Sequence, residues 1–213
     1  MLAHSVSLED EVPQLSGQIT MQDTIPQLSS KILSTNVNAL TETYNLIDEK
    51  DISSAAEYMV KAERIHFFGV GSSLMTAMEA KSKFMRITNK TECTFDPHLQ
   101  IMTAALLTEK DVAILISYSG STKDTIEIAK AAKEKGATTI SITRFAKSPL
   151  TNYSDITLLC GANEGPLQGG SLTAKISQLY LLDLLYFAYF KETNKESLYN
   201  KELTAKAVVE KML

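Results

Sequence analysis

Four hydroxyl side chains and a glycine lie together in the stretch ISYSGSTKDT, residues 116–125. They are Ser117, Ser119, Ser121 and Thr122, with Gly120 between them. The stretch follows an apolar run and precedes a segment whose apolar residues recur at helical spacing. Because a helix N-terminus presents unbonded N–H groups and a partial positive charge, it suits a phosphate. Hydroxyls add hydrogen-bond donors without charge, so the stretch predicts a neutral cradle for a phosphoryl group.

A helix cap would explain part of this pattern. Ser121 and Asp124, three residues apart, resemble a capping box. Capping does not require four hydroxyls, however, and the phosphate interpretation explains the whole set better. The stretch is not a P-loop because no Gly-Lys-Ser/Thr follows it, and Lys123 is expected to face solvent.

A second turn with polar residues is Gly69-Val70-Gly71-Ser72-Ser73, at the end of the apolar segment 64–68. Glycines let the backbone turn sharply and approach a ligand closely. The alternative is that the glycines serve turn geometry and a serine caps the next helix. A dinucleotide fingerprint is not complete here, since its third glycine is missing.

The elements that must position these turns follow from hydrophobic spacing. Strands are expected at residues 64–68, 91–95, 112–116, 138–143 and 156–160, and helices at 31–47, 73–88, 97–107, 122–135, 171–190 and 196–212. A further helix, with Asp51 as its N-cap, is expected to carry Ile52, Ala55, Ala56 and Met59. Short strands that are apolar on both faces and separated by helices are typical of a parallel sheet covered on both sides. We therefore expect an α/β fold, a doubly wound three-layer α-β-α sandwich with a five-stranded parallel sheet. Ligands of such folds bind outside the carboxyl ends of the strands, where both turns lie.

Composition narrows the class of protein. The chain has 213 residues, 44% of them hydrophobic, and a net charge of −4 without a basic cluster, so nucleic-acid binding by this chain alone is not expected. Cys93 and Cys160 are far apart and are interpreted as buried thiols in a reducing cytosol. No apolar run reaches about 18 residues and no signal peptide is visible, so a cytoplasmic protein without membrane contact is expected.

The succession of FFGVGSS, DPH, ISYSGSTKDT, a glutamate-containing loop and a long helix resembles the sugar isomerase (SIS) domain over about residues 35 to 210. FDPH and GGSLTAKISQLYLLDLL make it most similar to the effector domain of RpiR/MurR-type bacterial transcriptional regulators. The resemblance implies a phosphosugar ligand. It matches Ser73 to the serine of the first turn, Ser117, Ser119 and Thr122 to the phosphate-binding hydroxyls, and Gly120 to the turn glycine. Tyr118 and Ser121 occupy variable positions, where only the backbone N–H groups are expected to serve.

Three further residues lie near the expected site. A lone histidine is more often structural, but His98 follows Asp96-Pro97 at a helix start and fits the family's Asp-x-His pattern, which favours a hydrogen bond with the sugar. Glu164 follows the fifth strand, where SIS isomerases place a base; a loop carboxylate that binds a hydroxyl or solvent is an equal alternative. Lys175 is expected to be a solvated helix lysine. The full set of expected ligand-binding residues is Gly71, Ser72, Ser73, His98, Ser117, Tyr118, Ser119, Gly120, Ser121, Thr122 and Glu164.

Two functions remain open from the sequence. The resemblance favours a phosphosugar-sensing effector domain of an RpiR-type regulator, with residues 1–30 as the connector left from a missing N-terminal helix-turn-helix domain and 31–213 as the SIS domain. DNA would then be bound only through that missing domain, and no catalysis, cofactor or metal is expected. The alternative is a free-standing aldose–ketose phosphosugar isomerase. Apolar helices at 31–47 and 171–190 indicate a homodimer or tetramer.

Overall fold

The structure of the protein is a computed structural model that describes residues 14–16, 19–161 and 173–209. Its centre is a five-stranded parallel sheet in the order β4-β3-β5-β6-β7. The strands are β3 (Arg64–Gly69), β4 (Thr91–Cys93), β5 (Asp111–Ile116), β6 (Thr138–Thr143) and β7 (Ile156–Leu159). All six residues of β5, the middle strand, are buried. The predicted parallel sheet is confirmed.

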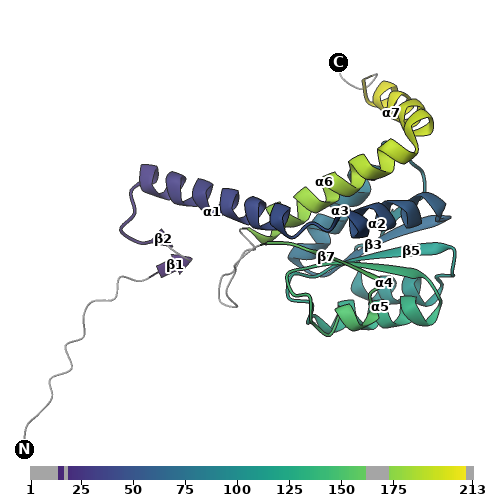
Figure 1. The fold of residues 1–213 in the computed structure, drawn as a ribbon, viewed down its shortest axis with the longest axis horizontal. Helices are drawn as coiled ribbons and strands as arrows, with labels where there is room; N and C mark the ends of the chain where they lie inside the picture. The colour runs from purple at the N-terminus through teal and green to yellow at the C-terminus, as the bar shows by residue number, and fades with distance from the viewer. Residues whose placement is uncertain (1–13, 17–18, 162–172, 210–213) are drawn as a thin grey trace, which may run out of the picture.

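Helices cover both faces of the sheet (Figure 1). One face carries α2 (Glu49–Lys61), α3 (Ser72–Phe84) and α6 (Ala174–Glu192), and the other carries α4 (Pro97–Ala105) and α5 (Lys123–Glu134). Because successive strand residues point to opposite faces, Phe67 and Ile114 enter the first core while Phe68 and Leu115 enter the second. The three-layer α-β-α sandwich is therefore confirmed as well.

Two helices extend beyond the sandwich. α1 (Ile25–Asn45) begins six residues before the expected apolar stripe, because Thr24 and Gln27 form a capping box and Pro26 suits a helix start. Most of α1 projects away from the body, and only its C-terminal part is buried, at Ala39 and Thr43 (Figure 1). α7 (Asn194–Val209) continues from the end of α6.

Two details differ from the sequence-based expectation. A small antiparallel pair, β1 (Gln14–Ser16) and β2 (Ile19–Thr20), precedes α1 where only a polar arm was expected, because such short strands give no periodic signal. α2 is capped by Asp48 rather than Asp51; the Asp48 carboxylate accepts hydrogen bonds from the N–H groups of Lys50 and Asp51. Among the described residues, no helix combines the length and apolar character needed to cross a membrane.

Candidate functional site

The two hydroxyl-bearing turns leave the sheet side by side. After β3 the chain passes to β4 on one side and then crosses over to β5 on the other, so the strand order reverses between β3 and β5. Gly69, the last residue of β3, is in register with Ile116, the last residue of β5. The turns at residues 70–73 and 117–122 therefore meet at the switch point, where doubly wound sheets bind ligands.

The loop after β5 holds its hydroxyls in a compact turn. Ser117 is buried, and its N–H donates to the Ile142 carbonyl while its Oγ donates to Thr122 Oγ1 over 3.4 Å. The Gly120 N–H closes the turn on the Ser117 carbonyl. Ser119 is exposed, and its Oγ accepts from the Ser121 N–H at 3.2 Å. Ser117, Ser119 and Thr122 thus lie on one short turn, as the phosphate interpretation requires.

The N-terminus of α5 is not capped in the way that Ser121 and Asp124 suggested. The N-cap residue is Thr122, one position later, and its side chain makes no capping hydrogen bond within the described part of the chain. The Ser121 Oγ instead donates to the Ser119 carbonyl at 3.3 Å. Since the Thr122 side chain does not cap the first turn of α5 in the described part of the chain, the N–H groups and partial positive charge of this helix N-terminus face the loop that carries the three hydroxyls.

The loop after β6 packs directly against Gly120, in the turn after β5. The Gly120 φ of +61° lies in the left-handed region, and a Cβ there would stand 2.2 Å from Ser148 Oγ. Its carbonyl accepts from the Leu150 N–H at 3.0 Å. The chain after Leu150 forms a short 3₁₀ turn, η1 (Thr151–Tyr153). Only glycine combines this backbone conformation with such close contact.

Tyr118 contributes to the site through its backbone. Its carbonyl accepts from the Arg144 N–H at 3.0 Å and from Thr143 Oγ1 at 3.2 Å. Its half-buried ring lies edge-on to Phe145, with centroids 6.3 Å apart, and packs against the core. The ring and the carbonyl therefore hold the loop against the body of the domain, and the expected role of the Tyr118 N–H toward a ligand stays a prediction.

The turn after β3 is held by a residue that sequence reasoning missed. Gln100 of α4 is fully buried; its Oε1 accepts from the Gly69 N–H at 3.2 Å and its Nε2 donates to the Gly69 carbonyl at 2.9 Å. A Cβ at Gly69 would lie 2.7 Å from the Ser73 carbonyl oxygen, whereas one at Gly71 would meet nothing within 4 Å. Gly71 thus borders open space. Ser72 and Ser73 follow it at the start of α3.

The other residues that the sequence analysis considered are His98, Glu164 and Lys175. His98 is exposed in the first turn of α4, where the Asp96 carboxylate caps the helix by accepting from the Leu99 N–H at 3.0 Å. It follows β4, the edge strand next to β3, so it lies at the carboxyl edge of the sheet on the far side of β3 from the turn after β5. Glu164 lies outside the described residues. Lys175 is half-buried near the start of α6.

Arg144 is a second residue that the sequence analysis did not single out. It directly follows β6 at the same edge of the sheet, its side chain is only 26% exposed, and its guanidinium lies 3.9 Å from the Glu42 carboxylate of α1. The only sequence signal was its position at the end of a β-branched strand. It brings a cation beside a loop whose own donors are uncharged.

The chemistry of the site is that of hydrogen-bond donors. In the described ranges, no group of three histidine, cysteine, aspartate or glutamate residues could hold a metal ion. Burial raises the pKa of the Cys93 thiol to about 11, which makes it a poor nucleophile at neutral pH. What the arrangement can do is bind an oxyanion and contact a polar body attached to it.

Comparisons with known proteins agree with this geometry. The family model described as the SIS domain matches residues 58–188. An HTH-type transcriptional regulator from Haemophilus influenzae is 39% identical over 183 residues, which cover 86% of this chain and 64% of that protein. The HTH-type transcriptional regulator RpiR of Escherichia coli K12 is 29% identical over 84% of this chain and 60% of its own length. This chain thus spans somewhat less than two thirds of these relatives.

A solved structure is similar over nearly the same region. The Vibrio vulnificus NanR protein complexed with ManNAc-6P superposes with a TM-score of 0.83 at 30% identity, covering 87% of this chain and 71% of that one. The sheet, the family match and this similarity agree, and they bear out the resemblance on which the sequence interpretation rested. The chain belongs to the SIS domain family.

Proposed function

We propose that this chain is the phosphosugar-sensing effector domain of an RpiR-type transcriptional regulator of sugar metabolism. The observation that carries the proposal is the pair of hydroxyl-bearing turns at the switch point, next to a helix N-terminus whose N-cap residue, Thr122, makes no capping side-chain hydrogen bond to any described residue. The regulator names of the relatives support a role in transcription. DNA contacts would belong to a helix-turn-helix segment outside this chain, in the part of the relatives that it does not span.

The ligand would bind through its phosphate at the turn after β5. Ser117, Ser119 and Thr122 would donate hydroxyl hydrogen bonds, and the N–H groups at the start of α5 would add the helix field. The sugar would then extend toward Gly71, Ser72 and Ser73, with His98 at the outer edge and Glu164 from the loop after β7. NanR is described with ManNAc-6P, so a sugar phosphate is the class to test here.

A binding signal could leave the site through α1. At the exit of β7 the Gly161 N–H donates to Thr43 Oγ1 at 2.9 Å, and the Gly161 carbonyl accepts from Ser177 Oγ of α6 at 3.0 Å. Arg144 and Glu42 add a charged contact between the loop after β6 and α1. Because α1 leads toward the N-terminus, a ligand with different affinities for two positions of these loops would shift the position of α1.

Dimerisation belongs to the same proposal. α1 exposes an apolar stripe that includes Leu33, Val37 and Tyr44, each at least half exposed, and it carries only two charged residues, Lys31 and Glu42. The second apolar helix that the sequence suggested, α6, is largely used inside the chain, since its core residues pack against α1, α2 and α3. We therefore assign the contact with a second copy to α1.

A ligand screen tests the proposal. The melting temperature would be measured with ManNAc-6P, glucosamine 6-phosphate, fructose 6-phosphate and ribose 5-phosphate, each against its unphosphorylated sugar. A ligand that binds only the folded state at 100 times its Kd stabilises by about 2.7 kcal/mol, so one phosphosugar should raise the melting temperature by several degrees. If no phosphosugar changes it, the proposal is wrong.

Replacing single hydroxyls locates the phosphate. Ser119→Ala removes one donor to a charged group, which is worth about 1.5–3 kcal/mol, so the Kd of the active phosphosugar should rise roughly ten- to hundredfold by titration calorimetry. Ser121→Ala is the matched control, because its hydroxyl already bonds within the loop, and its Kd should stay within about twofold. Equal effects of the two substitutions would place the phosphate elsewhere.

The same samples decide between sensing and isomerisation. NMR spectra of each sugar phosphate incubated with the protein would reveal conversion between aldose and ketose. Binding without conversion supports the sensor. Conversion that is lost in Glu164→Gln would instead make the chain an isomerase with Glu164 as its base.

A further inference from the structure

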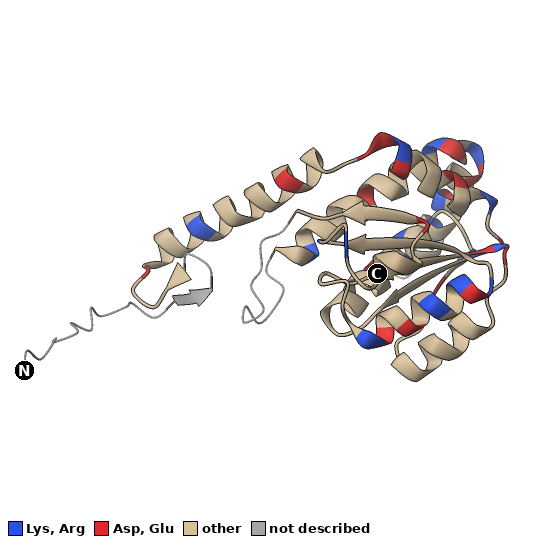
Figure 2. Ribbon diagram, turned by 60° about the horizontal axis from the view of Figure 1, so that its bottom comes forward, with Lys and Arg blue, Asp and Glu red and all other residues tan. Residues whose placement is uncertain are grey.

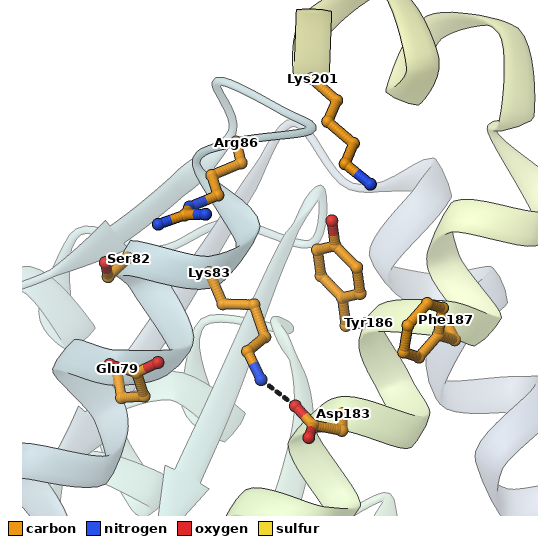
Figure 3. A pocket seen from close by; sticks show the side chains of 8 residues that line it. All are labelled: Glu79, Ser82, Lys83, Arg86, Asp183, Tyr186, Phe187 and Lys201. Atoms are coloured by element: carbon orange, nitrogen blue, oxygen red, sulfur yellow. Dashed lines mark hydrogen bonds and ion pairs between the residues drawn. The ribbon is translucent and has the colours of Figure 1, made fainter. Parts of the chain in front are cut away.

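A second cavity lies on the far side of α3 and α6 from the turns described above. It has a volume of about 450 Å³ and opens between the C-terminal half of α3, the second half of α6, and α7 (Figure 3). Both α3 and α6 begin at the carboxyl edge of the sheet, and α3 alone is 13 residues long. The cavity is lined from Glu79 of α3 to Arg86 just after it, so at a rise of about 1.5 Å per residue it lies about 10–20 Å from the turn after β3.

Specific hydrogen bonds build this cavity. Asn200 Nδ2 donates to the Ile87 carbonyl at 2.9 Å, and Thr204 Oγ1 donates to the Arg86 carbonyl at 3.1 Å. Both bonds run from α7 to the carbonyls at the end of α3. They bring Lys201, one residue after Asn200, to the same cavity as Arg86.

One end of the cavity carries both acidic and basic side chains, and the other end carries only basic ones. Figure 3 shows Glu79 and Asp183 at the end near Lys83, and Arg86 and Lys201 at the other end. Lys83 forms an ion pair with Asp183. Arg86 and Lys201 form no ion pair within the part of the chain that the structure describes, and the Lys201 Nζ lies 5.9 Å from the centre of the Phe190 ring. Two cations that share a cavity repel each other, and an anion between them removes that cost.

Aromatic and apolar surface adjoins the two cations. The Tyr186 hydroxyl points toward Lys201, and Phe187 is 65% exposed at the rim (Figure 3). A neighbouring cavity of about 490 Å³ shares Ser82, Arg86 and Lys201 with the first. Its other side is formed by apolar residues of α3 and α7: Met85, Ala205, Val208 and Val209. The two cavities form one groove with a cationic centre and an apolar extension.

We propose that this groove is a second small-molecule site, which takes an organic anion with a flat or apolar body. The anionic group would lie between Arg86 and Lys201, and the apolar body would lie on Tyr186 or along Met85 and Val208. The proposal does not depend on the phosphosugar assignment.

A pair of matched probes tests it. 8-Anilinonaphthalene-1-sulfonate is a flat aromatic anion, and N-phenyl-1-naphthylamine has the same rings without the sulfonate. Fluorescence titration of the full chain should give saturable binding of one sulfonate per chain. The neutral probe should bind at least tenfold more weakly, and sodium chloride should weaken only the sulfonate.

Substitutions place the anion. The double variant Arg86→Gln/Lys201→Gln should raise the Kd of the sulfonate probe at least tenfold while leaving the neutral probe unchanged. Lys195→Gln, an exposed position of α7 outside the cavity, is the control and should have no effect. Ser119→Ala should also bind the probe normally, which separates this groove from the phosphosugar site. A circular dichroism melt shows that each variant is folded.

Three outcomes would overturn the proposal. The two probes could bind equally well, which would make the groove a merely apolar surface. The double variant could retain full affinity for the sulfonate, which would put the anion elsewhere. The signal could fall as protein concentration rises while light scattering reports association, which would make the groove a contact between copies of the chain.

Discussion

At the scale of the residue, Gly120 carries two constraints at once. Its left-handed backbone forms the turn of the loop after β5, and the space that a side chain would need is filled by Ser148. Gly136, at the end of α5, shares the first constraint with a φ of +80°, but a Cβ there would come no closer than 3.5 Å to a neighbouring atom. Substitutions at these two glycines can therefore separate the cost of a strained backbone from the cost of a steric clash.

We expect Gly136→Ala to lower the free energy of unfolding by about 1–2 kcal/mol, the cost of a left-handed alanine. Gly120→Ala should cost more, because the loop after β6 must also move, and it alone should weaken phosphosugar binding. Urea denaturation and calorimetry of both variants measure this. If both substitutions cost the same and neither affects binding, the loop after β6 does not support the site.

His66 gives the fold a dependence on pH. It is buried in β3 and stacks on Phe68, and its Nε2 has no hydrogen-bond partner among the residues that the structure describes. Burial lowers its pKa below the usual 6.5, and Arg64 nearby lowers it further, although Asp111 and Glu92 oppose this shift. The folded state therefore favours neutral His66. The stability that this adds to the folded state is fully present above pH 6.5 and is lost as the pH falls toward the lower folded pKa.

As the pH falls below 6.5, the free energy of unfolding should thus decrease by up to about 1.4 kcal/mol per pH unit until the lowered folded pKa is reached. His66→Leu should remove this slope. Asp111 gives a second, more acidic step: burial opposes its ionisation, but hydrogen bonds from Arg64 and Thr108 outweigh burial and hold its pKa below 3.8. Urea denaturation at a series of pH values would show the two steps. A slope that persists in His66→Leu would assign the first step to another group.

At the scale of the element, the junction of α1, β7 and α6 depends on a close approach. A Cβ at Gly161 would stand 2.3 Å from Glu42 Cβ, so α1 lies directly on the backbone at the exit of β7. Thr43 is fully buried there and accepts the Gly161 N–H. This contact joins the helix that leads out of the domain to the edge that carries the candidate site.

Thr43→Val keeps the shape of the side chain but leaves the Gly161 N–H without its acceptor. The cost of an unsatisfied buried donor is about 1–3 kcal/mol, and amides in the C-terminal half of α1 should exchange faster with deuterium. Thr41→Val is the control, because Thr41 is exposed and its hydroxyl bonds only to Val37 of its own helix. Unchanged exchange in Thr43→Val would mean that α1 is held in another way.

At the scale of the whole molecule, charge is distributed unevenly. Both signs are interspersed over the helices and loops of the body, whereas α1 is almost without charge (Figure 2). A projecting helix with an exposed apolar stripe is typical of a surface that another protein covers. The isologous contact of two copies through α1 is the arrangement that we propose.

Val37→Asp would put a charge in the middle of this stripe, and we expect it to convert a dimer to a monomer in light scattering coupled to gel filtration. Asn38→Asp adds the same charge 100° further around the helix and should leave the dimer intact. A wild-type chain that is monomeric at high concentration would contradict the proposed contact.

The sequence by itself determined the layers of this protein and the residue types of its candidate site. Strands apolar on both faces specify a parallel sheet covered by helices, and that pattern is local enough to be visible in one chain. The cluster from Ser117 to Thr122 was likewise visible because its hydroxyls are contiguous. The strand order, in which β3 and β5 are neighbours, was a result of the tertiary structure, and it brings that cluster beside the turn after β3.

Only the tertiary structure decided how the site is supported. Gln100, Ser148 and Thr43 act through contacts with residues 28 or more positions away, which no spacing reveals. The groove of Arg86 and Lys201 is of the same kind, since its two cations are more than 100 positions apart and meet only because α7 docks on the end of α3. Local patterns report which face of an element is buried, but the partner of a buried polar group depends on how separate elements are packed.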